Sequence, residues 1–311
     1  MKTKPIGGID QSNLNYRSMN EALIKEKFKN LTVWKRDGQR APHKPLMILY
    51  ALGRLKRSDE RLINFPTIND DVTRLLRDFG PFRKSYRPEF PFWRLQNDGI
   101  WQVTGTDGIS INKSGDVKKT ELIERNAAGG FTPEIFNAIK TDEQLFRDIM
   151  QELLDANFPS SIHDDILQSA GVQLDKKQGI KIRDPKFREK ILRAYEYKCA
   201  ICGFDVRLDH IPIALEAAHI KWHNAGGPDI ETNGLALCTM HHKLFDRGAI
   251  TISENLHMIV SDRAHGSQGF DDWLMRFHRK KLNNPQRITY LPNPVFRDWH
   301  VREVFQGYGR D

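Results

Sequence analysis

Two short pairs of metal-binding residue types stand out in the second half of this 311-residue sequence. Cys199 and Cys202 form a CxxC pair, and Cys238 and His241 form a CxxH pair further along. In each pair the two ligands are close enough for one turn of backbone to supply two corners of a tetrahedral zinc site. The pattern predicts a structural Zn²⁺ site that uses every cysteine of the chain. The alternatives are three buried apolar cysteines, or a redox pair at Cys199 and Cys202.

A histidine, an asparagine and a second histidine occupy a predicted strand, loop and helix in the same region. The strand is expected around His219, a glycine-rich loop leads to Asn233, and the helix carries His242. The joint pattern AAHI, NG and CxxHHxxFDxG, between Cys199 and Gly248, resembles the motif of the HNH endonucleases. Each piece alone is common, whereas the joint pattern is specific. The resemblance implies a ββα-metal fold.

The resemblance also implies a role for each of these residues in the hydrolysis of a phosphodiester. This reaction needs an activated water, stabilisation of the charge that develops on the phosphate, and help for the leaving oxygen. By resemblance, His219 is the general base and His242 binds one divalent cation, Mg²⁺ or Mn²⁺. Asn233 either orients the loop of the base or completes the metal shell. The alternative is that the three side chains only satisfy hydrogen bonds in a core.

The sequence departs from the family pattern at one position. Many HNH proteins carry Asp or His immediately before the base as a second metal ligand, where this chain has Ala218. Glu216 faces the same side of a strand as Ala218 and could supply the carboxylate, the alternative being a plain surface glutamate. His241 and His242 point about 100° apart on a helix. We therefore assign His241 to zinc and His242 to the catalytic cation, with the exchanged assignment as the alternative.

Two basic segments in the first half of the chain are candidates for DNA contact. One contains Arg40 and His43, and the other, residues 81–94, interleaves basic residues with aromatic residues and prolines. The alternative for such a run is an aromatic core with solvated Arg and Lys around it. Both segments, and the order of the domains, resemble the sulfur-binding domain that precedes HNH modules in phosphorothioate-dependent restriction endonucleases. This resemblance covers most of the chain and implies double-stranded, phosphorothioate-modified DNA as the partner.

Sulfur in place of a phosphate oxygen is larger, softer and less hydrated, so a rigid apolar cup favours it. Aromatic rings and proline suit such a cup because they have few rotamers to freeze. Phe90 and Pro91, with Tyr86, are the expected walls, and basic side chains are expected to hold the charged group. The expected contact residues are Arg40, His43, Arg83, Lys84, Tyr86, Phe90 and Pro91.

Composition agrees with a nucleic-acid partner. The formal net charge is +8, which favours a polyanion. No apolar run approaches the roughly 18 residues that span a bilayer, and the N-terminus has no apolar stretch of a secretory signal. We therefore expect no membrane association and a cytoplasmic location.

The elements that position these residues fall into two expected domains. Helices are predicted near 20–30, with Leu23, Ile24 and Phe28 inward, and at 45–53 and 66–79. Short strands are expected at 93–95 and 100–103, and a further helix should open at Asp184. The expected fold class is α+β. A mainly helical DNA-reading domain with short strands spans 1–158, a linker spans 159–180, and a ββα-metal (HNH) domain with a zinc knuckle spans 181–311.

These expectations favour a modification-dependent endonuclease that reads phosphorothioate DNA. Two alternatives stay open at this point. One is an HNH endonuclease directed to methylated DNA, which would need a pocket for a flipped base. The other is a non-catalytic DNA-binding protein in which the motif is only a zinc-stabilised platform. A homodimer is a further possibility, because one HNH site cuts one strand.

Overall fold

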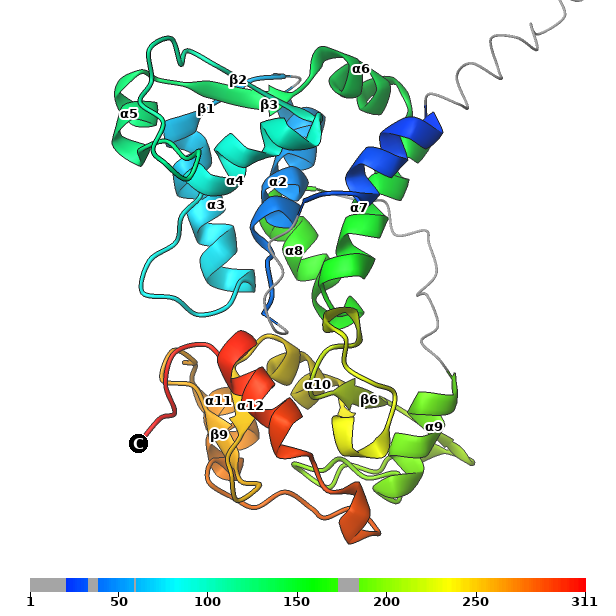
Figure 1. The fold of residues 1–311 in the computed structure, drawn as a ribbon. Helices are drawn as coiled ribbons and strands as arrows, with labels where there is room; N and C mark the ends of the chain where they lie inside the picture. The colour runs from blue at the N-terminus through cyan, green and yellow to red at the C-terminus, as the bar shows by residue number, and fades with distance from the viewer. Residues whose placement is uncertain (1–20, 33–38, 59, 173–184) are drawn as a thin grey trace, which may run out of the picture.

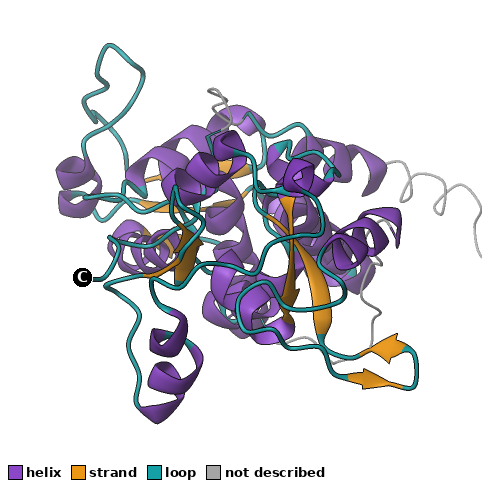
Figure 2. Cartoon of the chain, turned by 90° about the horizontal axis from the view of Figure 1, so that it is seen from below, coloured by secondary structure: helices purple, strands orange, loops and turns teal. Residues whose placement is uncertain are grey.

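The computed structural model describes residues 21–32, 39–58, 60–172 and 185–311 of the chain. Figure 1 shows two units, an N-terminal unit formed by the residues up to 172 and a C-terminal unit formed by residues 185–311. Each unit contains its own cluster of buried apolar residues. Helices dominate both units and the strands are short (Figure 2), so the fold class is α+β, as expected.

The N-terminal unit is built around one buried helix, α2 (His43–Ser58). Its apolar run from Leu46 to Leu52 is almost entirely inaccessible to solvent. The helices that pack on it are α3 (Phe65–Phe79), α4 (Glu89–Arg94), α6 (Pro133–Thr141), α7 (Glu143–Asn157) and α8 (His163–Ala170). A Cβ at Gly53 would lie 2.1 Å from the carbonyl oxygen of Ala170 in α8. Gly53 is therefore a close packing contact within the helix, not the helix end that the sequence predicted.

A small antiparallel sheet completes the N-terminal unit. Its strand order is β1-β3-β2, formed by β1 (Ile63–Asn64), β3 (Ala128–Phe131) and β2 (Trp101–Thr104). Trp101 pairs with Phe131 across the sheet, and its ring also packs edge-on against Phe92 of α4. This aromatic group fixes α4 and the following 3₁₀ helix η1 (Leu95–Asp98) against the sheet. α5 (Lys119–Glu124) also belongs to this unit, as does a helix over residues 21–29, in the region where the sequence predicted one.

A two-stranded hairpin organises the C-terminal unit. β6 (Leu215–His219) and β7 (Gly234–Cys238) are antiparallel, with His219 opposite Gly234. The helix α10 (Thr239–Asp246) follows β7 directly, so the ββα arrangement implied by the HNH resemblance is present. The other elements are α9 (Pro185–Ala194), β4 (Arg207–Leu208), β5 (Ile211–Pro212), η3 (His223–Ala225), η4 (Glu231–Asn233), β8 (Ile250–Ile252), β9 (Met258–Val260), α11 (Gln268–Trp273), η5 (Met275–Phe277), η6 (Ile288–Tyr290) and α12 (Pro294–Glu303).

Two further expectations about local structure are wrong. Residues 93–95, expected as a strand, belong to α4 and η1. Phe92 and Leu95 are both fully buried, and their separation puts them on one face of a helix. Leu23, expected to face inward with Ile24 and Phe28, is 54% exposed. The helix expected at 66–79 and the strand at 100–103 are confirmed with shifts of one residue.

The segment 159–180, expected as a linker, is folded over its first part. The 3₁₀ helix η2 (Ser160–Ile162) and α8 lie in this segment, and Ile162 and Ile166 are buried in the N-terminal core. These buried residues were not recognised in the sequence because most of their neighbours in the segment are polar. Asp184, expected as the cap of α9, lies outside the described residues.

The two units share part of one apolar core. Trp222 and Trp299 of the C-terminal unit belong to the same buried cluster as the helices of the N-terminal unit. Their rings meet edge to face with centroids 5.9 Å apart. The two units are therefore packed against each other and are not joined by the chain alone.

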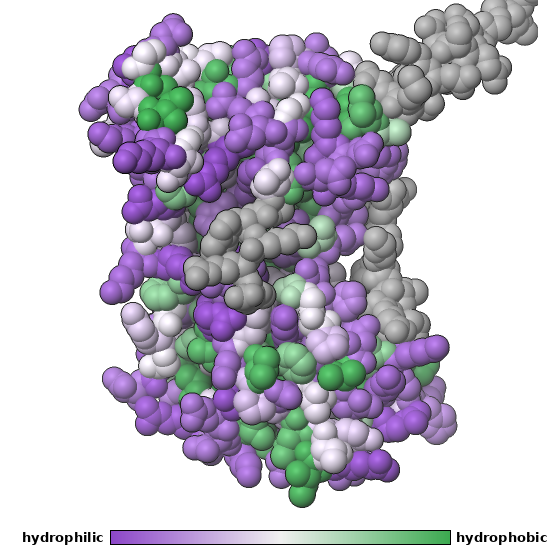
Figure 3. Space-filling model, viewed as in Figure 1, coloured by the Kyte–Doolittle hydropathy of each residue, from purple (hydrophilic) through white to green (hydrophobic). Residues whose placement is uncertain are grey.

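Polar side chains dominate the face of the molecule drawn in Figure 3, where apolar side chains form small separate groups. Within the parts of the chain that the structure describes, every helix is too short or too polar to cross a membrane.

Candidate active site, zinc site and DNA-reading surface

The four predicted zinc ligands lie together in the C-terminal unit. The ligand atoms of Cys199, Cys202, Cys238 and His241 are all within 4.8 Å of one another. The Sγ atoms of Cys202 and Cys238 are 4.0 Å apart, and His241 Nδ1 lies 3.2 Å from Cys238 Sγ. Zinc with Zn–S bonds of about 2.3 Å spaces its tetrahedral ligands by distances of this size. The donor set and its spacing therefore fit a zinc ion.

Three elements hold this cysteine–histidine cluster in place. Cys199 and Cys202 follow α9, Cys238 ends β7, and His241 lies in the first turn of α10. The Nε2 atom of His241 is 3.0 Å from the carbonyl oxygen of Trp273, so this ring nitrogen donates outward and Nδ1 faces the sulfurs. Hydrogen bonds with Cys202, and then Cys238, hold the pKa of the Cys199 thiol below its ordinary value. The thiolate is the form that binds metal.

His219 is the last residue of β6 and is held on two sides. Its Nε2 atom lies 2.7 Å from Asp229 Oδ1, and its ring stacks on Phe187 of α9 at a centroid distance of 3.9 Å. The residue is 9% exposed. When Asp229 accepts the Nε2 proton, Nδ1 is the nitrogen that can take a proton from water. The exposed His223, the first residue of η3, lies 3.8 Å from the same carboxylate.

Asn233 is fully buried and ties together the two ends of the loop after β6. Its Oδ1 atom accepts from the backbone nitrogen of Lys221 at 2.8 Å. Its Nδ2 atom donates to the carbonyl oxygens of Lys221 and Pro228, each at 3.0 Å. A Cβ at Gly227 would lie 1.8 Å from the Lys221 carbonyl oxygen, so the loop can only close with glycine there. Of the two roles open to Asn233, this geometry supports the orientation of the loop.

Glu216 and His242 meet on the other side of the hairpin. His242 Nδ1 lies 2.5 Å from Glu216 Oε2, and His242 Nε2 lies 3.0 Å from Asp246 Oδ2. The imidazole is 2% exposed, whereas the Glu216 side chain is 43% exposed. A half-exposed carboxylate beside this buried imidazole fits a divalent cation such as Mg²⁺ or Mn²⁺, which keeps several water ligands. The adjacent His241 faces the cysteines, in line with the original assignment of the two histidines.

The structure does not gather all the predicted catalytic residues around one point. Glu216 and His219 are separated by three positions on β6, so the alternation of a strand directs them to opposite faces. The site therefore consists of two pairs, His219 with Asp229 and Glu216 with His242.

Three residues in or around these pairs were missed in the sequence. Asp229 and Phe187 hold His219, and Asp246 holds His242. A signal existed for Asp246, because it follows His242 by four residues on one helix face. Asp229 and Phe187 had no comparable signal, since each meets its partner from a separate element.

Three of the expected DNA contacts line one open groove of about 440 Å³. They are Arg83, Lys84 and Tyr86. The other residues that line the groove were not among the expected DNA contacts. The full lining is Thr73, Arg77, Phe82, Arg83, Lys84, Ser85, Tyr86 and Arg263. Arg263 comes from the C-terminal unit, so the groove crosses the junction between the two units. Four of its eight residues are basic, which suits a polyanion.

Of the expected sulfur-pocket walls, Phe90 and Pro91 lie on α4, which packs against α2, whereas Tyr86 precedes α4 in the chain. Phe90 is half-buried, with the guanidinium of Arg94 over its ring at 4.8 Å and that of Arg87 at 5.9 Å. Pro91 is buried within α4. His43 begins α2, and burial, followed by the charge of Arg83, lowers its pKa. The structure thus places His43 near basic charge.

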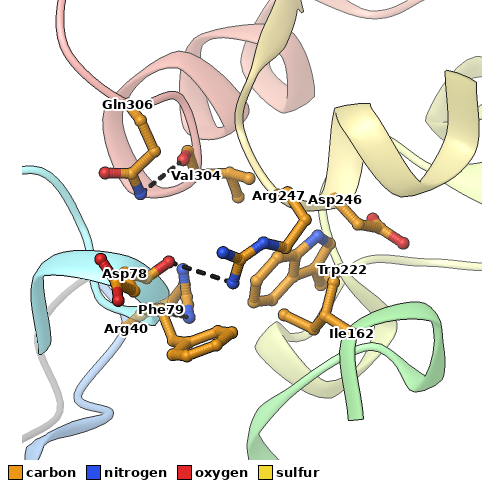
Figure 4. Close-up of a pocket in the computed structure, with 9 residues that line it drawn as sticks. All are labelled: Arg40, Asp78, Phe79, Ile162, Trp222, Asp246, Arg247, Val304 and Gln306. Carbon is orange, nitrogen blue, oxygen red and sulfur yellow. Dashed lines mark hydrogen bonds between the residues drawn. The ribbon is translucent and has the colours of Figure 1, made fainter. Parts of the chain in front are cut away.

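Arg40 is not directed at a DNA surface, so the contact role expected for it is wrong. Its guanidinium donates to the carbonyl oxygens of Phe79 at 2.7 Å and Glu303 at 2.9 Å, and it lies 4.0 Å over the ring of Trp222. Burial lowers its pKa to about 9. Figure 4 shows Arg40 among residues of both units that line one small cavity.

The comparisons with known proteins cover both units. Residues 21–175 match the family described as ScoMcrA-like, DNA sulfur-binding domain, and residues 199–253 match the family described as HNH endonuclease. None of the curated proteins matches the chain.

Several solved structures resemble parts of the chain. The sulfur binding domain of ScoMcrA complexed with phosphorothioated DNA is 18% identical, with a TM-score of 0.42 over 48% of this chain and 98% of that one. The Type IV phosphorothioation-dependent restriction endonuclease ScoMcrA is 16% identical (TM-score 0.41), and the match covers 52% of this chain and 38% of that one. The modification dependent TagI restriction endonuclease is 24% identical (TM-score 0.28), with 43% and 41% covered. This chain thus spans less than half of either endonuclease. It carries a ScoMcrA-like DNA sulfur-binding domain followed by an HNH endonuclease domain.

Proposed function

We propose that this protein is a modification-dependent restriction endonuclease that recognises phosphorothioate-modified double-stranded DNA and cleaves it at a one-metal HNH site. The observation that carries the proposal is the union, in one chain, of a sulfur-binding domain with an HNH domain whose Glu216 and His242 lie side by side. A DNA substrate also implies that the protein works in the cytoplasm. The homodimer expected from the sequence has no support and is not part of the proposal.

In this proposal the N-terminal unit, residues up to 172, reads the modification. The basic groove with Arg83, Lys84 and Tyr86 contacts the phosphate backbone without regard to sequence. Phe90, under the guanidinium groups of Arg87 and Arg94, offers an apolar surface for sulfur beside positive charge for the anion. Backbone affinity and sulfur preference are therefore assigned to different residues, which makes them separable by mutation.

In the C-terminal unit, residues 185–311, Glu216 and His242 would hold one Mg²⁺ or Mn²⁺. Such a cation neutralises charge that develops on the scissile phosphate. His219 accepts a proton from the attacking water, and Asp229 stabilises the imidazolium that forms. Asn233 keeps the loop in the form that presents Asp229 to His219. The cysteine–histidine cluster would hold structural zinc and takes no part in the chemistry.

The proposal is tested with one duplex prepared with and without a single backbone sulfur. We expect the sulfur-bearing duplex to bind at least tenfold more tightly in fluorescence anisotropy, a preference of about 1.4 kcal/mol. Phe90→Ala should reduce this preference, whereas Arg83→Ala should weaken both duplexes alike and flatten the salt dependence. Equal affinity of the wild type for both duplexes would refute sulfur recognition. A preference for a methylated duplex instead would favour base readout.

Cleavage is tested with the same duplexes and Mg²⁺ or Mn²⁺. His219→Ala should lower the cleavage rate by about 10²- to 10⁴-fold, the range for loss of a general base, while DNA affinity stays the same. His210→Ala is the matched control, because that histidine is exposed and lies in the turn between β4 and β5. Unchanged cleavage by His219→Ala would remove the assigned base.

A further inference from the structure

A loop of the C-terminal unit forms one wall of the basic groove. Arg263 lies in this loop, shortly after β9, and its guanidinium carbon is 5.8 Å from the centre of the Phe82 ring in the N-terminal unit. The Phe82 ring also packs edge-on against Tyr308, with centroids 5.8 Å apart. The two units therefore meet at the groove, and the charge of Arg263 adds to the charges that the N-terminal unit supplies.

The segment after α12 holds the loop that carries Arg263. Asp262 donates its backbone N–H to the carbonyl oxygen of Tyr308 at 2.8 Å, and Tyr308 donates its own backbone N–H to Asp262 Oδ1 at 3.0 Å. Gln306 accepts from the Arg263 guanidinium at 3.2 Å and donates to the carbonyl oxygen of Gly80 in the N-terminal unit at 3.0 Å. These hydrogen bonds fix the position of Arg263 with respect to both units.

Gly307 allows the close approach of this segment to the loop. Its φ is +82°, a conformation that residues with a side chain rarely adopt. A Cβ at this position would lie 2.2 Å from Asp262 Oδ1 and 2.9 Å from Arg263 Cγ. The backbone is therefore built to bring Arg263 against the N-terminal unit.

The basic side chains of the groove carry charge that carboxylates of the described residues do not neutralise. Arg77, Arg83, Lys84 and Arg263 are exposed, and none of the four forms an ion pair within the part of the chain that the structure describes. The described lining of the groove includes neither Asp nor Glu. Like charges gathered in this way repel one another, and a bound polyanion removes the repulsion.

We propose that Arg263 of the C-terminal unit binds the DNA backbone in the same groove as Arg77, Arg83 and Lys84, so that both units hold one stretch of a strand. The inference rests on the proposed function, because its ligand is the DNA that the protein reads and cuts. The groove of about 440 Å³ accommodates about two or three consecutive phosphates, which rise by about 3.4 Å each along one strand. Affinity for DNA is then a property of the joined units, and the C-terminal unit lies at a fixed offset from the phosphates that the N-terminal unit binds.

A purely structural role for Arg263 makes a different prediction from a phosphate contact. If Arg263 only packed on Phe82 and Gln306, its loss would lower stability and leave the salt dependence of DNA binding unchanged. If it binds a phosphate, its loss should reduce the slope of log K against log salt concentration by about 0.9, because one counterion fewer is released. Affinity at 0.1 M salt should then fall about five- to tenfold, equally for DNA with and without sulfur.

The experiment compares full-length wild type with Arg263→Gln and Arg263→Lys by fluorescence anisotropy at several salt concentrations. One duplex is used with and without a single backbone sulfur. We expect Arg263→Gln to show the reduced slope and affinity with both duplexes, and Arg263→Lys, which keeps the charge, to restore the slope.

A second series locates the phosphate that Arg263 binds. Single phosphates of the sulfur-bearing duplex are replaced by neutral methylphosphonates, and the wild type should lose affinity at each contacted phosphate. Arg263→Gln should no longer respond at one of these positions. That position should lie within about three nucleotides of the one at which Arg83→Gln no longer responds, because the two side chains share one groove.

Arg276→Gln is the matched control. Arg276 is also an exposed arginine of the C-terminal unit, its guanidinium carbon lies 5.8 Å from the centre of the Phe277 ring, and it is not among the residues that line the groove. A wild-type salt slope and affinity in a folded Arg263→Gln protein would overturn the inference. If Arg263→Gln unfolds, Arg263→Met, which keeps an unbranched stem over Phe82 without the charge, gives the same readouts and the same criterion.

The outcomes also separate this inference from the proposed function. If Arg263→Gln lowers the slope for both duplexes while the wild type binds them equally, the shared groove stands and sulfur recognition fails. If the wild type prefers the sulfur-bearing duplex but responds to no methylphosphonate through Arg263, sulfur recognition stands and the shared groove fails.

Discussion

Two neighbouring histidines on α10 have opposite surroundings. His241 faces three sulfurs, with its outer nitrogen on a backbone carbonyl, whereas His242 lies between the carboxylates of Glu216 and Asp246. Soft thiolates in a closed set of four favour zinc that stays bound, and oxygen ligands with few protein donors favour a hard cation that keeps its water. The comparison teaches that a single helix turn can serve a structural metal on one side and a chemical site on the other.

We expect the largest effect when the zinc site beside His241 is destroyed. Cys199→Ala should remove zinc and unfold much of the C-terminal unit, because binding free energy at structural zinc sites, about 10 kcal/mol or more, contributes directly to folding. Zinc content by mass spectrometry and thermal unfolding by circular dichroism measure the two effects. A Cys199→Ala protein that unfolds like the wild type would contradict the zinc role of the cluster.

Loss of the site formed by His242 and its carboxylate neighbours should lower the rate of DNA cleavage and leave the zinc content unchanged. His242→Ala is expected to reduce DNA cleavage at least about 100-fold and to cost about 1–3 kcal/mol of stability, because Asp246 loses a buried partner. Zinc content should remain at the wild-type value. Met240→Ala, on the exposed face of α10, is the control. If His242→Ala lost zinc as well, the separation of the two sites would be wrong.

A third histidine sharpens the comparison because it faces neither metal site. His300 stacks on Phe245 of α10, and burial lowers its pKa to about 4. The unfolded chain binds the proton near the ordinary pKa of about 6.5, before the folded protein does. Stability should therefore fall as the pH falls from about 6.5 to 4, by about 3 kcal/mol in total, and level off below.

Urea unfolding of the wild type and of His300→Gln across this pH range measures the contribution of His300. The difference in free energy of unfolding between the two proteins should shrink as the pH falls. A difference that stays constant from pH 6.5 to 4 would show that His300 is not the group that titrates.

The sequence was most informative where partners are close in the chain. The zinc ligands were found because each pair is local, and the assignment of His241 and His242 followed from the geometry of a helix. The ends of α2 and the helical structure of residues 93–95 were missed, because Gly53 and the segment around α4 are decided by contacts with distant helices and strands. Burial against other elements overrode the local preferences.

The same reason explains the errors at the functional sites. Arg40 has the residue type of a DNA contact, yet its partners Glu303 and Trp222 lie in the other unit, and only the fold brings them together. Asp229 likewise meets His219 across the loop after β6, and Ser161 contacts Asp246 in the other unit. The type of a residue indicates which chemistry its side chain can perform. The residues that it contacts in the fold decide whether the side chain is available to a ligand.

The tryptophans that the C-terminal unit buries in the N-terminal core limit how such proteins can evolve by recombination. Trp222 follows the strand of His219, and Trp299 lies in α12, so both are part of the nuclease fold while they complete the core of its neighbour. Exchange of the DNA-reading module for an unrelated one would leave two large indole rings without cover. A successful chimaera must therefore inherit the matching face together with the new specificity.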